Sequence, residues 1–434
     1  PCYHYPSFVR RSIRDDLAAI DSRYQKKQGT KIDKFEYIRA MTTYAAGHLK
    51  QDLVKLWADE SAEAINWYGD RLAERGVELW HESGDSVDPA YHHHFPTGHS
   101  PRWRTSDDGT GKPLNGNKIL FDYATKKGAR FDYNTRMIKL EKKDGRVTGC
   151  IAVDGDGKYV RYNAKKGVVI ATGGFSANVE LRAKLNPFYG EGFKTTNLPC
   201  AQGDGIFMAE KVGAASVNME QIQTYPMCDP ISGAIELIDD ARFEGAILIN
   251  QEGKRFVEEL ERRDVMSKAI LEQTGKYCYA LFNQAVEDRA HAIEHHQDEV
   301  RVFSKTGILK TGKTLDEVAA AFDIPADALK ATVARVNEFA KTGKDLDFGY
   351  RGKFSDLSEG PYWIYRGVPS VHHTMGGLKI NPKAQVLDKN DKPIPGLWAA
   401  GEVTGCTHGS NRLGSTAYTD IMVFGRIAGT EAAK

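Results

Sequence analysis

The sequence predicts an α/β fold of two domains built around buried parallel strands. Its 434 residues, 41% of them hydrophobic, suffice for two domains with sizeable cores. An apolar run at 167–172 ends in Gly173-Gly174, which is typical of a buried parallel strand whose end lets a ligand or another backbone come close. A second apolar run, 396–400, ends at Gly401 in the same way. Because ligands of open α/β sheets bind at the carboxyl ends of strands, these two distant segments predict one nucleotide-type site.

The rest of the pattern predicts helices near both ends of the chain and a separate middle lobe. Residues 33–80 keep apolar side chains at helical spacing over two segments. The His, Pro, Gly and Ser residues of 91–116 predict a loop, and short β patterns follow at 131–140 and 147–153. In the middle lobe, Thr314 to Glu317 form a capping box that opens a helix, and Pro325 opens another that runs to Gly343. A final helix is expected at about 419–433.

Composition excludes several classes of protein. The 59 basic and 58 acidic residues nearly cancel, so nucleic acid is not expected as a partner. Six scattered cysteines include no C-x-x-C spacing, which excludes covalent c-type haem and common zinc knuckles. No apolar run approaches the roughly 20 residues of a membrane-spanning helix. We therefore expect a soluble protein, with the cytoplasm favoured and the periplasm as the alternative. The start at Pro1-Cys2-Tyr3-His4 predicts that the chain begins inside a longer gene product.

Several motifs, in this order and spacing, resemble one family of flavoproteins. These segments are Ala171–Phe175, Gly203–Gly205, Gly245–Asn250 with Gly253–Phe256, Arg263-Asp264, His372–Gly377, Ala399–Gly405 and His408–Gly414. From about residue 16 to the end, the chain resembles the soluble fumarate reductase family. That family also holds urocanate reductases and, more distantly, the succinate dehydrogenase flavoprotein subunit and 3-ketosteroid dehydrogenases.

The resemblance implies a Rossmann-like FAD-binding domain made from both chain ends, with an inserted α+β capping domain. The expected bounds are 1–219 and 372–434 for the FAD-binding domain and 220–371 for the capping domain. The family's first strand and its G-x-G-x-x-G turn have no match in residues 1–15, so this part of the FAD site is expected to be missing. The remaining cofactor contacts implied by resemblance are Ala18, Met137, Ala171, Thr172, Gly173, Gly174, Asp204, Gly401, Glu402, Gly414, Ser415 and Ala417.

The resemblance also implies a reaction. In this family, hydride passes from flavin N5 to one carbon of an activated double bond while an arginine protonates the neighbouring carbon; Arg263 holds that position. Because the pKa of arginine lies above ~12, a relay must refill Arg263, and Arg242 with Asp239 matches the family's relay. His373 and Arg412 match the residues that grip the substrate carboxylate, and a guanidinium forks onto a carboxylate with two hydrogen bonds.

Two departures from the fumarate reductase pattern bear on the substrate. Tyr225-Pro226 replaces a His-Pro dipeptide, and a phenol is not a cation at neutral pH. Ile238-Asp239-Asp240-Ala241-Arg242 replaces Thr-Glu-x-x-Arg, so acidic groups stand where a second carboxylate would bind. Tyr225 with Asp240 resembles urocanate reductases, which makes Asp240 the candidate partner of an imidazole and Phe243 a ring contact. Alternatively, Asp239 or Asp240 takes only the relay role of the family's Glu.

Other interpretations stay open at this point. Tyr418 is placed beside the flavin by the resemblance, and a substrate-facing tyrosine favours a ketosteroid or other enone oxidoreductase as the alternative enzyme. The absent G-x-G-x-x-G allows a catalytically degenerate binding module. No metal is expected, although His92-His93-His94 with His99, and the string His291-x-x-Glu294-His295, fit metal-ligand patterns. With no haem motif, electrons are expected from an external flavin domain, cytochrome or nicotinamide cofactor.

Overall fold

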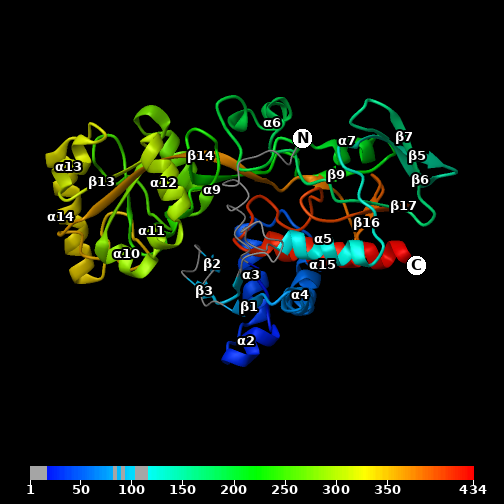
Figure 1. Cartoon of the computed structure of the whole chain (residues 1–434), viewed down its shortest axis with the longest axis horizontal. Helices are drawn as coiled ribbons and strands as arrows, with labels where there is room; N and C mark the ends of the chain where they lie inside the picture. The colour runs from blue at the N-terminus through cyan, green and yellow to red at the C-terminus, as the bar shows by residue number, and fades with distance from the viewer. Residues whose placement is uncertain (1–16, 82–85, 89–92, 103–115) are drawn as a thin grey trace.

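The computed structural model describes residues 17–81, 86–88, 93–102 and 116–434. Buried side chains form two large hydrophobic clusters and a smaller third one. The second cluster contains residues between Met227 and Tyr365, whereas the first contains residues from Ala18 to Ile222 and again from Val371 to Ala428. The two ends of the chain therefore share one core, and the middle of the chain has its own (Figure 1).

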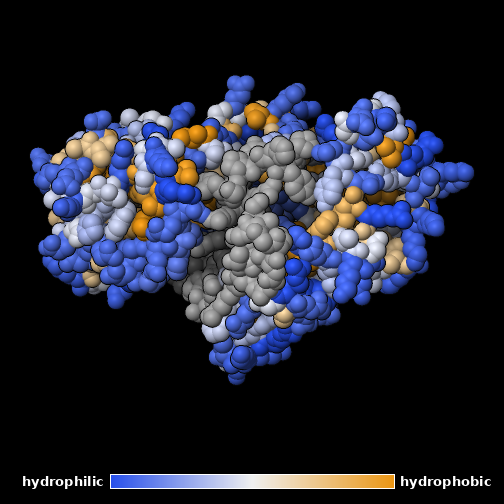
Figure 2. All heavy atoms as spheres, in the orientation of Figure 1, coloured by the Kyte–Doolittle hydropathy of each residue, from blue (hydrophilic) through white to orange (hydrophobic). Residues whose placement is uncertain are grey.

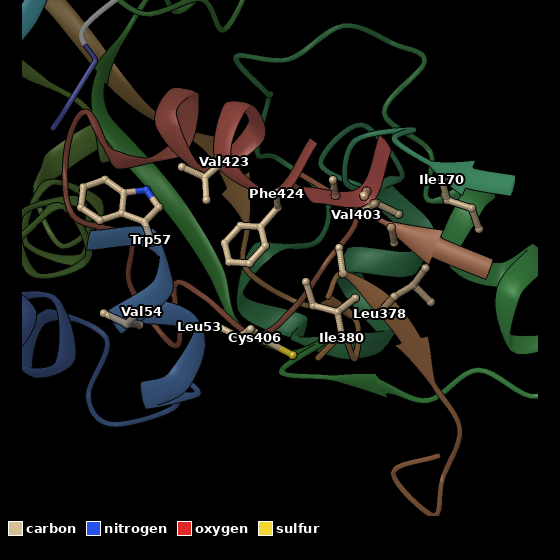
Figure 3. Packing of buried hydrophobic residues seen from close by; sticks show 14 of the residues in the cluster. Leu53, Val54, Trp57, Ile170, Leu378, Ile380, Val403, Cys406, Val423 and Phe424 are labelled. Atoms are coloured by element: carbon tan, nitrogen blue, oxygen red, sulfur yellow. The ribbon is translucent and has the colours of Figure 1, made fainter. Parts of the chain in front are cut away.

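The half built from both chain ends, called here the terminal half, rests on helices from opposite ends of the sequence. Helix α4 (Gln51–Ala73) buries Leu53, Val54 and Trp57 on one face, and it packs against α15 (Thr416–Ala433). Figure 3 shows these side chains converging with Val423 and Phe424 of α15. The helices predicted over 33–80 are thus confirmed as α3 (Lys34–Tyr44) and α4. The final helix begins three residues earlier than expected, directly after Ser415 in a left-handed conformation (φ 62°).

The strands predicted to end at the glycines are parallel neighbours. Strand β8 (Val168–Ile170) pairs in parallel with β17 (Pro393–Ala399), which pairs on its other side with β16 (Gln385–Leu387). Within the described ranges, the other edge of β8 has no partner strand, and Val169 there is 39% exposed. The expected absence of a first dinucleotide-binding strand concerns residues 1–15, which lie outside the described residues.

A second, antiparallel sheet of the terminal half packs on β17. It consists of β5 (Arg136–Lys143), β6 (Arg146–Val153) and β7 (Tyr159–Asn163). The strand predicted at 131–140 begins later, at Arg136, because Phe131 and Tyr133 instead pack beside Phe121 of α5 (Gly116–Lys126). Remaining elements here are α2 (Arg23–Gln28), β1 (Glu78–His81), β2 (Ser86–Asp88), β3 (His93–Phe95), β4 (His99–Arg102), α6 (Val179–Leu185), α7 (Asp204–Glu210), β9 (Ser216–Val217) and β15 (Gly377–Leu378). The region predicted as a loop over 91–116 therefore contains two short strands.

The middle of the chain, called here the cap, consists of one five-stranded sheet with several helices around it. Its strands follow the order β10 (Ile222–Cys228), β14 (Tyr362–Thr374), β12 (Cys278–Asn283) and β11 (Ile247–Ile249), with β13 (Leu309–Gly312) also on β14. The other elements are η3 (Leu237–Asp239), α8 (Asp240–Phe243), α9 (Arg263–Leu271), α10 (Gln284–Ala290), α11 (Ala292–His295), α12 (Gln297–Thr306), α13 (Leu315–Ala320) and α14 (Ala326–Thr342). The expected cap at Thr314 is confirmed, since its side chain accepts a hydrogen bond from the Glu317 amide at 3.2 Å.

Strand β14 connects the two halves. Its first residues pair with β12 and β13 inside the cap, and its last residues pair with β10, with Gln223 opposite His373. Figure 1 shows this long strand running from the cap on the left to the centre of the molecule. The domain boundary expected at 371–372 falls inside this continuous strand.

The surface agrees with the polar composition. In the view of Figure 2, hydrophilic residues cover most of the coloured surface of both halves. Within the described residues, no helix is long and apolar enough to cross a membrane.

Candidate active site

Arg263 begins α9 and lies over an aromatic ring. Its guanidinium carbon is 4.8 Å from the centroid of the Tyr225 ring, which comes from β10. Arg263 Nη1 also donates to the Gln223 Oε1 atom at 3.3 Å, and the Gln223 side-chain amide in turn donates to the Arg412 carbonyl at 2.8 Å. A buried amide therefore holds the guanidinium of the cap against the loop that carries Arg412.

The Tyr225 hydroxyl reaches the expected relay pair. It donates to Asp239 Oδ2 at 3.3 Å, and Tyr365 donates to Asp239 Oδ1 at 3.1 Å. Arg242 holds the same carboxylate through Nε at 3.0 Å and Nη2 at 2.8 Å. Burial raises the pKa of Asp239, and the charge and hydrogen bonds of Arg242 oppose that rise. The structure thus brings together Arg263, Tyr225, Asp239 and Arg242, as expected from the sequence.

Arg412 is paired with a histidine that the sequence interpretation did not assign. Its Nη2 donates to His372 Nε2 at 2.9 Å, and His372 Nδ1 lies 2.8 Å from the Thr196 hydroxyl. Because a guanidinium only donates, Nε2 must accept and Nδ1 must carry the proton. Burial, followed by the charges of Arg412 and Arg263, lowers the pKa of His372 well below its usual range. His372 is therefore a neutral partner that orients Arg412.

His373, the histidine that the sequence did assign, lies beside other groups. Its Nδ1 is 3.8 Å from Glu402 Oε1, and its ring meets the His408 ring edge-on at 5.5 Å. Burial and then the charge of Arg412 lower its pKa well below the usual range. His373 thus belongs to the same buried cluster, on the side of Glu402.

The cluster carries excess positive charge. Arg412 is 6% exposed, and its Nε has no hydrogen-bond partner. Burial and the nearby charge of Arg263 lower the pKa of Arg412 to about 9. Buried charges are normally paired, and an unpartnered guanidinium N–H suits a carboxylate oxygen. A buried guanidinium with an unpartnered N–H, near a second guanidinium and neutral histidines, is suited to an anion.

A second acidic group, Asp240, lies close enough to Tyr225 for its charge to act on the phenol. The Asp240 carboxylate accepts from His296 Nε2 at 3.0 Å, and both side chains are largely buried. Burial raises the pKa of Tyr225, and the charges of Asp239 and Asp240 add to that rise. Phe243 is 48% exposed, with the Arg242 guanidinium 4.6 Å above its ring. One side of this region is thus cationic, and the other side is acidic and aromatic.

The expected cofactor residues gather at the ends of β8 and β17. Ala171 and Thr172 follow β8 and are exposed, and a Cβ on Gly173 (φ 71°) would meet nothing within 4 Å. Ala18 donates from its amide to the Ser415 carbonyl at 2.9 Å, which places residue 18 beside the turn that opens α15. Open backbone at a strand end and a helix N-terminus are the features that hold a dinucleotide. These residues fit FAD.

Other expected cofactor residues have protein partners. Glu402 accepts from the Thr374 amide at 2.9 Å and its hydroxyl at 3.0 Å, and a Cβ on Gly174 would lie 2.6 Å from the Glu402 carboxylate. Asp204 begins α7 and is held by Arg136 in two hydrogen bonds of 2.7 and 2.8 Å, next to the half-buried Met137. Glu402 therefore supports the backbone after β8. The remaining expected residues lie near these segments. Gly401 comes shortly after the end of β17, and Gly414 and Ala417 lie on either side of Ser415 and the start of α15.

Tyr418 lies on the side of α15 that packs on α4 and α5. Its ring is 6.0 Å from that of Tyr68, and its hydroxyl donates to Asn117 at 3.5 Å.

Within the described ranges, no group of three or more His, Cys, Asp or Glu side chains is arranged to hold a metal ion. His92 lies outside the described residues, and His99 contacts the Ser22 hydroxyl at 2.6 Å. His291 contacts Glu294 at 2.9 Å on the surface of the cap.

The fold combines an open strand edge of nucleotide-binding type with a buried cationic cluster, and comparison with known proteins gives the family. A family model described as an FAD binding domain matches residues 18–417. The chain belongs to this family, and FAD is its cofactor.

Its relatives include named reductases. The chain is 46% identical over 303 residues to a urocanate reductase of Eggerthella lenta, covering 69% of this chain and 50% of that protein. It is 39% identical over 385 residues to a fumarate reductase (cytochrome) of Shewanella frigidimarina, covering 88% and 63%. The chain thus spans about half to two thirds of these relatives. The solved open conformation of a flavocytochrome c3 fumarate reductase superposes with a TM-score of 0.77 at 30% identity, covering 97% of this chain and 70% of that one.

Proposed function

We propose that this protein is an FAD-dependent reductase of a carbon–carbon double bond conjugated to a carboxylate, with a urocanate-like substrate. The observation that carries the proposal is a pair of guanidiniums: the buried Arg412, held by His372, and the partly buried Arg263, which lies over Tyr225. The first supplies a fixed partner for a carboxylate, and the second supplies a proton donor next to it.

Arg412 binds and polarises the substrate. Its unpartnered Nε–H donates to the carboxylate, and its charge draws electron density from the alkene as enolate character develops. His372 holds the Arg412 guanidinium in place through the hydrogen bond of 2.9 Å. His373 lies in the same cluster, next to Glu402. A carboxylate placed here also relieves the repulsion between Arg412 and Arg263.

Arg263 completes the reduction. FAD, when bound, supplies a hydride to one alkene carbon. Arg263 gives a proton to the neighbouring carbon, so the π bond is replaced by two C–H bonds and the product is the saturated acid. The relay that returns a proton to Arg263 includes the Asp239 and Arg242 pair. This pair meets Tyr225, whose ring lies under the Arg263 guanidinium, through the Tyr225 hydroxyl at 3.3 Å.

The far end of the substrate is nitrogen-bearing. Tyr225, Asp240 and Phe243 offer a hydroxyl, a carboxylate and a ring in the place where fumarate would need a second cationic partner. An imidazole N–H suits a carboxylate acceptor, whereas a second carboxylate is repelled by it. Urocanate reduction therefore fits better than fumarate reduction, the activity named for the Shewanella relative.

A neutral enone is a weaker candidate, because a steroid would leave Arg412 and Arg263 without a negative partner. A binding module without chemistry would have no use for a guanidinium beside a hydroxyl that leads to a relay. Electrons for each cycle come from an external donor, such as a flavin domain, a cytochrome or a nicotinamide cofactor.

The test is anaerobic stopped-flow oxidation of the reduced, FAD-loaded protein by urocanate, fumarate, cinnamate and an enone steroid. Fast oxidation by urocanate, lost in Arg263→Ala, supports the proposal. Turnover of fumarate at a comparable rate contradicts the assignment of the far end. Failure of the protein to retain FAD contradicts the reductase assignment and favours the binding module.

A further inference from the structure

The cap supplies an imidazole of its own to the carboxylate that we assign to the substrate's far end. His296 lies between α11 and α12, and its Nε2 is 3.0 Å from Asp240 Oδ2. An ionised carboxylate only accepts hydrogen bonds, so Nε2 carries the proton and donates it. The exposed fractions of the two side chains are 12% and 19%, so this contact is largely shielded from water.

The segment around His296 is fastened to the same turn by a second contact. The buried Glu299 carboxylate of α12 accepts from the amides of Leu237 at 2.8 Å and Ile238 at 2.9 Å. These amides open η3, which leads directly into Asp239 and Asp240. The α12 helix thus fixes the backbone of this turn through Glu299 and the Asp240 side chain through His296.

The bond from His296 engages one acceptor position of the Asp240 carboxylate. A carboxylate has about four acceptor positions on its two oxygens, so Asp240 can hold His296 and a ligand N–H at the same time. A carboxylate that is already oriented loses less rotational freedom when it binds a ligand. In addition, His296 makes no side-chain capping bond at the start of α12, so its imidazole is not needed to begin that helix.

We propose that His296 is a positioning residue that orients the Asp240 carboxylate toward the nitrogen-bearing end of the substrate. It thereby determines the preference for a substrate with a ring N–H over an acrylate without one. This inference rests on the proposed function, because it takes Asp240 as the acceptor for the far end. His296 acts only through Asp240 and takes no part in hydride or proton transfer.

The experiment compares two ligands that share the acrylate and differ in the ring, urocanate and cinnamate. The dissociation constant of each is measured by calorimetry on the oxidised, FAD-loaded protein, and KM and kcat are measured separately. His296→Leu is expected to weaken urocanate about tenfold, the usual effect of one lost hydrogen bond, with kcat nearly unchanged. The constant for cinnamate should change less than about twofold. His296→Gln places an amide N–H near the position of Nε2 and should recover most of the loss.

Two controls separate this role from a structural one. His295→Leu changes the neighbouring exposed histidine and should leave both ligands unaffected. In an Asp240→Asn background, His296→Leu should have a smaller effect, since its partner is already altered. Equal weakening of both ligands, no change for urocanate, or tighter binding by His296→Leu would each overturn the proposal. If the wild-type protein neither binds nor reduces urocanate, the proposed function fails first and this inference fails with it.

Discussion

The guanidinium of Arg263 and the ring of Tyr225 are stacked, with 4.8 Å between the guanidinium carbon and the ring centroid. The same tyrosine donates from its hydroxyl to Asp239 at 3.3 Å and meets the His372 ring edge-on at 5.7 Å. One side chain therefore contacts the proposed proton donor, the proposed relay and the partner of the arginine that we propose binds the carboxylate. Its ring and its hydroxyl should have separable effects.

Replacing Tyr225 by Phe keeps the ring and removes the hydroxyl. Because Arg263 starts each experiment protonated, the first turnover should keep its rate, whereas steady-state turnover should fall about tenfold as refilling slows. Stopped-flow and steady-state assays of the same preparation distinguish the two rates. Tyr225→Leu, which also removes the cation–π contact, should slow the first turnover as well. An unchanged steady-state rate in Tyr225→Phe would show that the hydroxyl is not part of the relay.

Replacing Tyr225 by His restores the dipeptide typical of fumarate reductases. An imidazole can become a cation near neutral pH, so a second carboxylate gains a charged partner. We expect kcat/KM for fumarate to rise about tenfold and that for urocanate to fall, since one good polar contact corresponds to about 1.4 kcal/mol. Steady-state assays with both acids measure the switch. A uniform loss for both substrates would contradict the assignment of Tyr225 to the far end.

Arg412 should strengthen substrate binding and lower the stability of the ligand-free protein. In the wild-type protein, urocanate at about 100 times its dissociation constant should stabilise the fold by about 2.7 kcal/mol. Arg412→Leu should lose this gain, while the ligand-free protein should keep or raise its melting temperature, because an unpaired buried charge has been removed. Thermal melts with and without urocanate report both effects. A large loss of ligand-free stability would instead indicate that the bond to His372 holds the loop together.

Asp420 makes stability depend on pH. Burial raises the pKa of this carboxyl from its ordinary 3.8 to about 7. A raised pKa means that the folded state keeps the proton after the unfolded state has lost it, so the stabilisation is full below about pH 4 and is lost toward pH 7. Asp420→Asn should therefore gain free energy of unfolding relative to wild type as the pH rises from about 4 to about 7, by up to about 1.4 kcal/mol per pH unit.

Denaturant titrations at several pH values check the Asp420 prediction. Asp327→Asn, at an exposed position of α14, serves as the control. A constant difference between Asp420→Asn and wild type over this pH range would show that Asp420 is already ionised in the folded protein.

The sequence predicted those parts of the site that depend on local pattern. The two apolar strands ending in glycine, which come before and after the cap in the sequence, are parallel neighbours as expected. Motif positions pointed to Arg263, Asp239 and Arg242. Arg242 contacts Asp239 directly, and, within the described residues, Arg263 is linked to Asp239 only by way of Tyr225.

What the sequence could not predict depends on long-range geometry. Neighbouring residues of a strand point to opposite faces, so only the fold decides whether His372 or His373 meets Arg412. The sequence shows two adjacent histidines at this position, but it does not show which of the two side chains points toward Arg412. His296 is likewise 56 positions from Asp240, and nothing in its local sequence indicates that contact.

The continuity of β14 has a consequence for engineering and for evolution. This strand begins in the core of the cap and ends at His372 and His373, whereas Arg412 belongs to the terminal half. The cap is therefore not an exchangeable module. A chimera that imports a foreign cap through residue 371 would join two unrelated strand segments immediately before His372. Grafts that change substrate range should instead carry β10 and the whole of β14 together, and lineages that diversified their caps would have had to keep this strand in register with Arg412.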